Sequence, residues 1–208
     1  YDSAGMAYSH ASGLRRVRAV GRVSELARRA QQEGVRTLCG IAHTRWATHG
    51  GVTEDNAHPH LSEGRGVGVC VIHNGIVENH LALREELLAQ GYAFGSQTDT
   101  EVIAHLLHRA LTGQDVQGPR GLFAAMQQVA GKLRGAFALA AIASDEPSVV
   151  VGARHGAPLL IGYGAQGAGE HYLASDTSAL LQATRTISYL DDGDIVEIRP
   201  GGVRVVDA

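Results

Sequence analysis

Cysteine, tryptophan and long apolar runs are scarce in this sequence. Its 208 residues include two cysteines, Cys39 and Cys70, and one tryptophan, Trp46. Two cysteines do not make the disulfide framework of a small secreted domain, so we expect a reducing, cytoplasmic location. Every apolar run is short and ends at glycine or a polar residue, which excludes a membrane-spanning helix and predicts no membrane partner. The polar first residues also predict no signal peptide.

An excess of basic charge is lacking too. The chain has 18 Lys and Arg against 21 Asp and Glu, a formal net charge of −3. No positive field therefore attracts nucleic acid, and we expect no nucleic-acid partner. Apolar residues make up 44% and charged residues 19%, which is typical of a globular protein. The length suffices for one full core, and without repeats or linkers we predict one domain over residues 1–208.

The order of strand and helix patterns predicts an α+β fold. We expect strands at 4–9, 14–20, 37–43, 67–73, 136–143, 148–153, 159–163, 171–174, 187–190, 195–199 and 203–206, and helices at 24–32, 80–90, about 98–111, 119–132 and 177–184. Ser24 and Asn79 are expected as N-caps, and Thr98 with Glu101 matches a capping box. Strands joined by short turns pair antiparallel, and the grouped helices argue against alternating βα units.

Polar side chains gather in the stretch from Ile41 to Gly75, where two predicted strands end. This stretch holds five of the eleven histidines and the only tryptophan. The histidines are His43, His49, His58, His60 and His73. Strands that deliver such residues to neighbouring loops are a common way to build a small-molecule site.

Three features of this region have both a structural and a functional interpretation. Arg45 is either a surface charge or a planar fork for a carboxylate. Asn74-Gly75 is either a hairpin turn or an oxyanion hole made by an amide and a backbone N–H. Asp99 either stabilises a helix start or binds an ammonium group. Taken together, the functional interpretations describe a site for an α-amino acid with a reacting carbonyl.

The glycine spacing at 162–167 and the two cysteines both favour structural interpretations. Gly162, Gly164 and Gly167 spell the glycine spacing of a dinucleotide-binding loop, but a strand follows instead of a helix, so we predict a hairpin. Cys39 and Cys70 sit among apolar strand residues without a neighbouring base. Each is more typical of an inert buried thiol than of a nucleophile.

The histidines permit a metal site but do not favour one. His58 and His60 flank Pro59, and His43 and His49 lie nearby in the sequence. Neither HExxH nor a cysteine–histidine zinc spacing is present. We therefore expect histidines packed among loop residues and no metal.

Several long motifs resemble one family. HTRWATHG at 43–50, NAHPH at 56–60, HNGIVEN at 73–79 and TDTEVIAH at 98–105 are similar to the glutaminase domain of glutamine–fructose-6-phosphate aminotransferases (isomerizing), also called glucosamine-6-phosphate synthases. Shorter matches are YDSAG at 1–5, LRGAFA at 133–138, ASD at 174–176 and DGDI at 192–195. The resemblance spans the whole chain.

The resemblance implies an N-terminal-nucleophile hydrolase fold, a four-layer αββα sandwich of two antiparallel sheets. Such domains hydrolyse L-glutamine without a cofactor and pass the ammonia to a sugar-isomerase domain, which makes glucosamine 6-phosphate from fructose 6-phosphate. By this resemblance the partners are L-glutamine and that second domain, and the full-length protein is a homo-oligomer.

The same resemblance assigns roles to individual residues. Arg45, Thr48 and His49 are expected at the glutamine α-carboxylate, and Asp99 at its ammonium. Asn74 and Gly75 form the oxyanion hole. Trp46 belongs to a loop that closes over glutamine, and His58 is a further family position near the site.

One departure from the family concerns the nucleophile. The family uses a cysteine at the mature N-terminus, with its own α-amine as the base, and here the first residue is Tyr1. Cys39-Gly40-Ile41 resembles the family's start but lies inside a predicted strand. We therefore expect a piece of a longer protein, inactive by itself. A glutamine-binding module without a nucleophile and a metal-dependent hydrolase built on the histidines are the alternatives.

Overall fold

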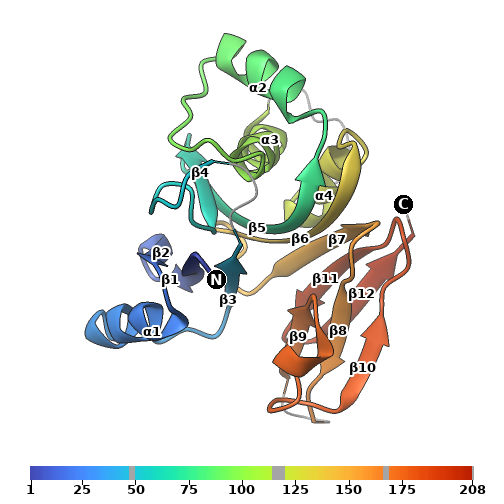
Figure 1. Ribbon diagram of the computed structural model, residues 1–208. Coiled ribbons are helices and arrows are strands. Elements are labelled where there is room, and N and C mark those ends of the chain that lie inside the picture. Colours follow the sequence, from blue (N-terminus) through green and yellow to red (C-terminus); the bar gives the residue numbers. More distant parts are fainter. Residues whose placement is uncertain (47–49, 114–119, 166–168, 208) are drawn as a thin grey trace.

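The computed structural model describes residues 1–46, 50–113, 120–165 and 169–207 (Figure 1). The strands are β1 (Ser3–His10), β2 (Gly13–Val20), β3 (Gly40–Arg45), β4 (His60–Gly64), β5 (Val67–Val77), β6 (Gly135–Ala143), β7 (Val150–His155), β8 (Leu160–Tyr163), β9 (His171–Ala174), β10 (Thr186–Tyr189), β11 (Ile195–Arg199) and β12 (Gly202–Val206). The helices are α1 (Val23–Gln32), α2 (His80–Ala89), α3 (Thr100–Thr112), α4 (Leu122–Ala130) and the 3₁₀ turn η1 (Thr177–Ala179). No helix in these ranges is long and apolar enough to cross a membrane.

A six-stranded antiparallel sheet forms the centre of the fold. Its strand order is β12-β11-β7-β6-β5-β4. Along β5, side chains alternate between the two faces: Val69 and Val71 face the helices, and Cys70 faces the other layer. The longest ladder joins β5 to β6 and pairs His73 with Leu139 and Gly75 with Phe137. Pairing with β6 therefore holds the second half of β5 in a fixed register.

Helices α3 and α4 cover one face of this sheet, and α2 packs against α3 (Figure 1). Helix α3 is buried along most of its length, and Ile103, Leu106 and Leu107 are at most 1% exposed. These side chains join Val69, Val71 and their neighbours on β6 and β7 in the largest core cluster. Burial of each large aliphatic side chain contributes roughly 1.5–3 kcal/mol. Helix α3 is thus fixed against β5.

Two three-stranded sheets cover the opposite face. In the first, β1 lies between β2 and β3, and in the second, β8 lies between β10 and β9. Ile41 of β3 packs on Cys70 and Ile142 of the central sheet, and Ile161 of β8 packs on Val196. Helix α1 covers the outside of the first sheet through Leu26. The α+β class and the antiparallel stacking are as predicted, with the second layer made of two sheets.

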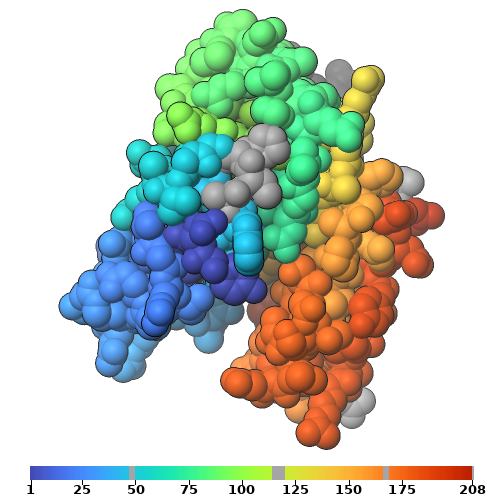
Figure 2. Space-filling model, in the orientation of Figure 1, coloured from blue at the N-terminus to red at the C-terminus, as the bar shows by residue number. Residues whose placement is uncertain are grey.

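In the described part of the chain, no strand pairing joins the two small sheets. Among the described residues β3 pairs only with β1, and β9 pairs only with β8. A cavity of about 330 Å³ lies between these two strands, with Ala42, Leu173, Ala138 and Ala140 among its lining residues. Figure 2 shows a hollow on this face, between the blue N-terminal part and the orange C-terminal part.

Most predicted elements are present, with a few corrections. Strand β4 was not predicted, because Ser62 and Glu63 look like loop residues. It forms because a tight turn returns the chain into β5 and pairs His60 with Val71. The helix expected at 177–184 is only the short η1. The glycine-spaced segment is the β8–β9 hairpin, as predicted, with Gly167 outside the described residues.

The helix caps differ more from the predictions. Ser24 is not the N-cap of α1, which follows Arg22, and Asn79 precedes α2 without a side-chain cap hydrogen bond. The capping box is also wrong. Glu101 instead turns its carboxylate to the preceding turn, where it accepts hydrogen bonds from the backbone N–H groups of Gly95 and Ser96 at 2.8 and 2.7 Å. The start of the helix expected at 119–132, Pro119, lies outside the described residues.

Candidate functional site

A cavity of about 400 Å³ opens where the end of β3, the second half of β5 and the beginning of α3 meet. The described residues that line it are Tyr1, His43, Thr44, Arg45, Trp46, His58, His73, Asn74, Gly75, Thr98, Asp99, Thr100 and Ser175. Six of the eight residues predicted from sequence are therefore in one place. The other two, Thr48 and His49, lie outside the described residues.

Arg45 is the last residue of β3 and lies in the wall of the cavity. It is 5% exposed, and its Nη1 donates to the carbonyl oxygen of Gly51 at 3.3 Å. Burial lowers the pKa of its guanidinium, and the charges of Asp2 and Asp99 raise it. An arginine stays protonated under such shifts. The cavity therefore has a fixed positive charge that matches a carboxylate.

Asp99 supplies the opposite charge, at the beginning of α3. It occupies the N-cap position, but its side chain makes no cap hydrogen bond to the helix. Its Oδ2 accepts a hydrogen bond from the backbone N–H of Val77 at 2.8 Å, and its side chain is 6% exposed overall. The positive end of the helix dipole stabilises a carboxylate at this place. Asp99 thus lies at the start of α3 and in the wall of the cavity, a position that fits both the structural and the functional interpretation.

Asn74 and Gly75 lie within β5 and not in a turn. They pair with Ala138 and Phe137 of β6, so the hairpin-turn interpretation is wrong. Gly75 has φ +130°, and a Cβ there would overlap the carbonyl oxygen of Ala136. Only glycine fits this position. The arrangement leaves the backbone around Gly75 open at the wall of the cavity.

Four histidines lie at or next to the same wall: His58, His60 and His73 are buried, and His43 is half-buried. The rings of His43 and His58 stack with centroids 4.3 Å apart, and His58 meets His60 edge-on at 5.0 Å. Burial lowers the pKa of His43, lowers those of His58 and His60 well below the usual value, and lowers that of His73 to about 4. The rings are therefore neutral at neutral pH. Within the described ranges no group of three or more His, Cys, Asp or Glu is arranged to hold a metal ion.

Neither cysteine is among the described residues that line the cavity. Cys39 and Cys70 are buried between the central sheet and the β2-β1-β3 sheet. Burial raises both thiol pKa values, that of Cys70 to about 12. A thiol with such a pKa is a poor nucleophile at neutral pH, which fits the inert interpretation.

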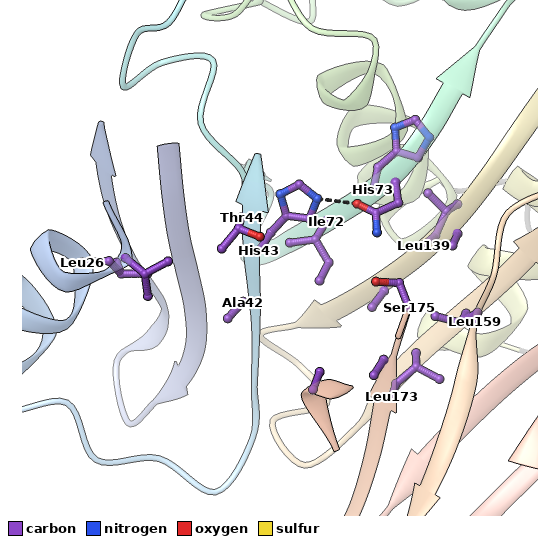
Figure 3. Close-up of a pocket in the computed structure, with 16 residues that line it drawn as sticks. Leu26, Ala42, His43, Thr44, Ile72, His73, Leu139, Leu159, Leu173 and Ser175 are labelled. Carbon is purple, nitrogen blue, oxygen red and sulfur yellow. Dashed lines mark hydrogen bonds between the residues drawn. The ribbon is translucent and has the colours of Figure 1, made fainter. Parts of the chain in front are cut away.

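Sequence reasoning assigned no role to three of the residues found here. Ser175 lies in both cavities, on the side of β9 (Figure 3). His43 bonds to Asn74, and Thr100 bonds to His73 at 3.0 Å. All three belong to segments quoted above as motifs. What the sequence could not show is which side chain of each motif turns inward.

Residues 43–182 match a family described as glutamine amidotransferase domain. The chain belongs to the glutamine amidotransferase domain family. It is 52% identical over 209 residues to a glutamine–fructose-6-phosphate aminotransferase [isomerizing] of Xylella fastidiosa (strain 9a5c), a match that covers 100% of this chain and 32% of that protein. A protein of the same name from Acidithiobacillus ferridurans is 50% identical over 208 residues, with the same shares covered. This glutamine amidotransferase domain thus spans about a third of the length of these curated relatives.

A solved structure supports the fold of the domain. Glutamine phosphoribosylpyrophosphate amidotransferase from B. subtilis is 24% identical and superposes with a TM-score of 0.81, over 99% of this chain and 43% of that one. At this identity the likeness concerns the fold alone. It confirms the predicted N-terminal-nucleophile hydrolase fold.

Proposed function

We propose that the chain is a glutaminase domain that hydrolyses the side-chain amide of L-glutamine to glutamate and ammonia. One observation carries the proposal: Arg45, Asp99 and the Asn74-Gly75 pair line a single cavity of about 400 Å³. A cation, an anion and an oxyanion site are the three features that an α-amino acid with a reacting carbonyl requires. The family match over residues 43–182 supports the same substrate.

In this proposal the two charges orient glutamine. The guanidinium of Arg45 binds the α-carboxylate, assisted by Thr48 and His49, and Asp99 binds the α-ammonium. Trp46, which is 74% exposed, belongs to the loop that covers the bound amino acid. His58 forms part of the wall behind Arg45. The side chain of glutamine then extends along β5 toward Asn74 and Gly75.

The reaction proposed at the amide is a two-step acyl transfer. A thiolate adds to the amide carbon, and the oxygen takes up the electron pair of the C=O bond. Asn74 and the N–H of Gly75 stabilise this oxyanion. The C–N bond then breaks, nitrogen leaves as ammonia after it gains a proton, and a thioester remains. Water attacks the thioester, releases glutamate and returns the thiol.

The nucleophile in this scheme comes from outside residues 1–208. Cys39 and Cys70 are buried away from the cavity, and their thiol pKa values are raised. A cysteine with a free α-amine combines a nucleophile with a base of pKa about 7.7–8.0. The cavity between β3 and β9, whose facing edges have no strand partner in the described ranges, reaches Asn74. A further strand in that space would bring such a cysteine to the oxyanion site.

The names of the relatives extend the proposal to a whole protein. We propose that residues 1–208 form one domain of a cytoplasmic, homo-oligomeric enzyme, and that no cofactor takes part in the glutaminase step. The ammonia passes to a sugar-isomerase domain outside these residues, which converts fructose 6-phosphate to glucosamine 6-phosphate. The share of the relatives' length that is covered, 32%, leaves room for that domain.

The deciding experiment measures glutamate and ammonia released from L-glutamine by the protein with its native neighbouring segments. We expect the two products in equal amounts, and none from L-asparagine, whose amide lies one methylene short of Asn74. Tight binding of glutamine without release would favour the nucleophile-less module. Loss of release on metal chelation would favour the hydrolase built on histidines. Absence of both binding and release would overturn the proposal.

A further inference from the structure

A hydrogen bond between His43 and Asn74 joins β3 to β5 at the oxyanion site. The Nε2 of His43 lies 2.7 Å from the Oδ1 of Asn74, the bond drawn as a dashed line in Figure 3. The amide oxygen can only accept, so the hydrogen is on Nε2 of the ring. Both residues line the cavity described above.

The direction of this bond decides what Asn74 offers to a substrate. With Oδ1 engaged by His43, the NH₂ end of the amide is left for the cavity. If His43 instead carried its hydrogen on Nδ1, its Nε2 would accept from Asn74, and Asn74 would turn its oxygen toward the substrate. An oxygen at that place would repel an oxyanion. The tautomer of His43 thus determines whether Asn74 can act.

The ring of His43 is held on one face by a ring that is itself fixed. One face stacks on His58 at 4.3 Å and 27° between the planes. The backbone of His58 lies close against β1, since a Cβ on Gly5 would overlap its carbonyl oxygen. Arg18 also donates to the carbonyl oxygen of the preceding residue, Ala57, at 3.2 Å. His43 is therefore kept at a fixed distance from β5.

We propose that His43 is a positioning residue that aims the amide N–H of Asn74 at the reacting carbonyl. The inference rests on the proposed glutaminase function and adds a residue that touches no reacting atom. Because it acts on the transition state through Asn74, its loss lowers kcat and leaves the KM for glutamine nearly unchanged. Arg45 and Asp99, by contrast, act on binding.

The side chain of His43 can be replaced in two matched ways. Glutamine places an amide N–H where Nε2 of histidine lies, whereas asparagine places it where Nδ1 lies, too short to reach Asn74. In the protein with its native neighbouring segments, we expect His43→Asn to lower kcat by roughly 10- to 100-fold, less than loss of the oxyanion donor itself. His43→Gln should recover most of that loss. Equal kcat values for the two variants would overturn the proposal.

A double-substitution cycle separates positioning from general support of the fold. In the Asn74→Ala background, His43→Asn should cause no further fall in kcat, since the group that it positions is gone. A second, independent fall would overturn the proposal. His105→Gln is the control, because this histidine is also buried and bonds to Ser62 at 2.8 Å but is not among the described cavity residues. It should lower the melting temperature and leave kcat unchanged.

A readout without turnover separates this proposal from the proposed function. The ¹⁵N NMR shifts of the His43 ring identify which nitrogen carries the hydrogen. We expect the Nε2–H tautomer in the unsubstituted protein. In the Asn74→Ala variant we expect a mixture of the two tautomers. An Nδ1–H tautomer would overturn the positioning role even if glutamine is hydrolysed. An Nε2–H tautomer in a protein that releases no glutamate would confirm the hydrogen bond but contradict the glutaminase function. The positioning role would then be contradicted as well.

Discussion

The carboxylate of Asp99 accepts a hydrogen bond from the backbone N–H of Val77 at 2.8 Å. This bond ties the beginning of α3 to the end of β5, two residues beyond Gly75. Asp99 and the Asn74-Gly75 pair are thus parts of one rigid unit. For the proposed function this means that the fold sets the distance between the ammonium and oxyanion positions before glutamine binds, which reduces the ordering cost of binding.

Asp99→Asn separates the charge of this residue from its structural bond. The asparagine oxygen can still accept from Val77, so we expect a nearly unchanged melting temperature. Without the negative charge, the KM for glutamine should rise by about 10- to 100-fold, the range for one charged hydrogen bond. Steady-state kinetics together with thermal unfolding check this. A large fall in melting temperature with normal KM would show that Asp99 is only structural.

Arg45→Lys tests whether the planar guanidinium of Arg45 binds the glutamine carboxylate. Lysine keeps the charge but cannot hold a carboxylate through two parallel N–H groups. We expect glutamine binding weaker by about 1.5–3 kcal/mol, measured by titration calorimetry. The exposed Arg134 gives the matched control, since Arg134→Lys should leave binding as it is. An unchanged affinity in the Arg45 variant would remove this residue from the site.

Asn74→Ala tests the oxyanion site. We expect kcat to fall by about 100- to 1000-fold, while binding of glutamate changes little. Asn79→Ala is the control: its amide accepts from the N–H of Arg134 at 3.0 Å and donates to the carbonyl of Lys132 at 2.9 Å, outside the cavity. It should lower stability and spare kcat. Parallel loss of binding and turnover in the Asn74 variant would argue for a structural role.

Motifs and strand patterns were readable from the sequence because they depend on local chemistry. The continuous apolar runs of β5 and β6 and the glycines that end helices are of this kind. Arg45, Asn74 and Asp99 could be grouped because each lies where a predicted strand ends or a predicted helix begins, and because their motifs resemble one family. The class of ligand was predicted from the chemistry of their side chains.

Contacts between distant segments could not be read in this way. Glu101 has the spacing of a capping box, yet it is turned to Gly95 and Ser96 by the packing of α3. Strand β4 exists because β5 is there to pair with it. The pairing of His43 with Asn74 joins residues 31 positions apart, and its register is set by two different sheets. Tertiary packing overrides local preference in each case.

The buried histidines predict a loss of stability in mild acid. Burial lowers the pKa of His73 to about 4, and those of His58 and His60 also lie well below 6.5. Above pH 6.5 neither the folded nor the unfolded chain protonates them. As the pH falls from 6.5 toward 4, only the unfolded chain takes up the protons. The free energy of unfolding therefore falls, by about 1.4 kcal/mol per pH unit for each such histidine.

Urea unfolding at pH 7.5, 6.0 and 5.0 measures this slope. His73→Gln should make the slope shallower by about one proton, because glutamine does not titrate. An unchanged slope in that variant, or a stability that is flat between pH 7.5 and 5.0, would contradict the buried neutral state of His73.

The last prediction concerns the two cysteines and the source of the nucleophile. Burial raises the pKa of Cys70 to about 12, so at pH 7 only on the order of one thiol in 100,000 is the reactive thiolate. Cys39 is also buried, with its Sγ 3.7 Å from the carbonyl oxygen of Val149. We expect iodoacetamide to modify both slowly, and Cys39→Ala and Cys70→Ala to leave glutamine turnover unchanged in the protein with its native neighbouring segments.

Residues 1–208 expressed alone should release no glutamate and should aggregate through the edges of β3 and β9, which have no strand partner among the described residues. An upstream segment that begins with cysteine should restore both solubility and turnover. If residues 1–208 alone hydrolysed glutamine, and either alanine substitution abolished that activity, the assignment of the nucleophile to a cysteine outside them would be wrong.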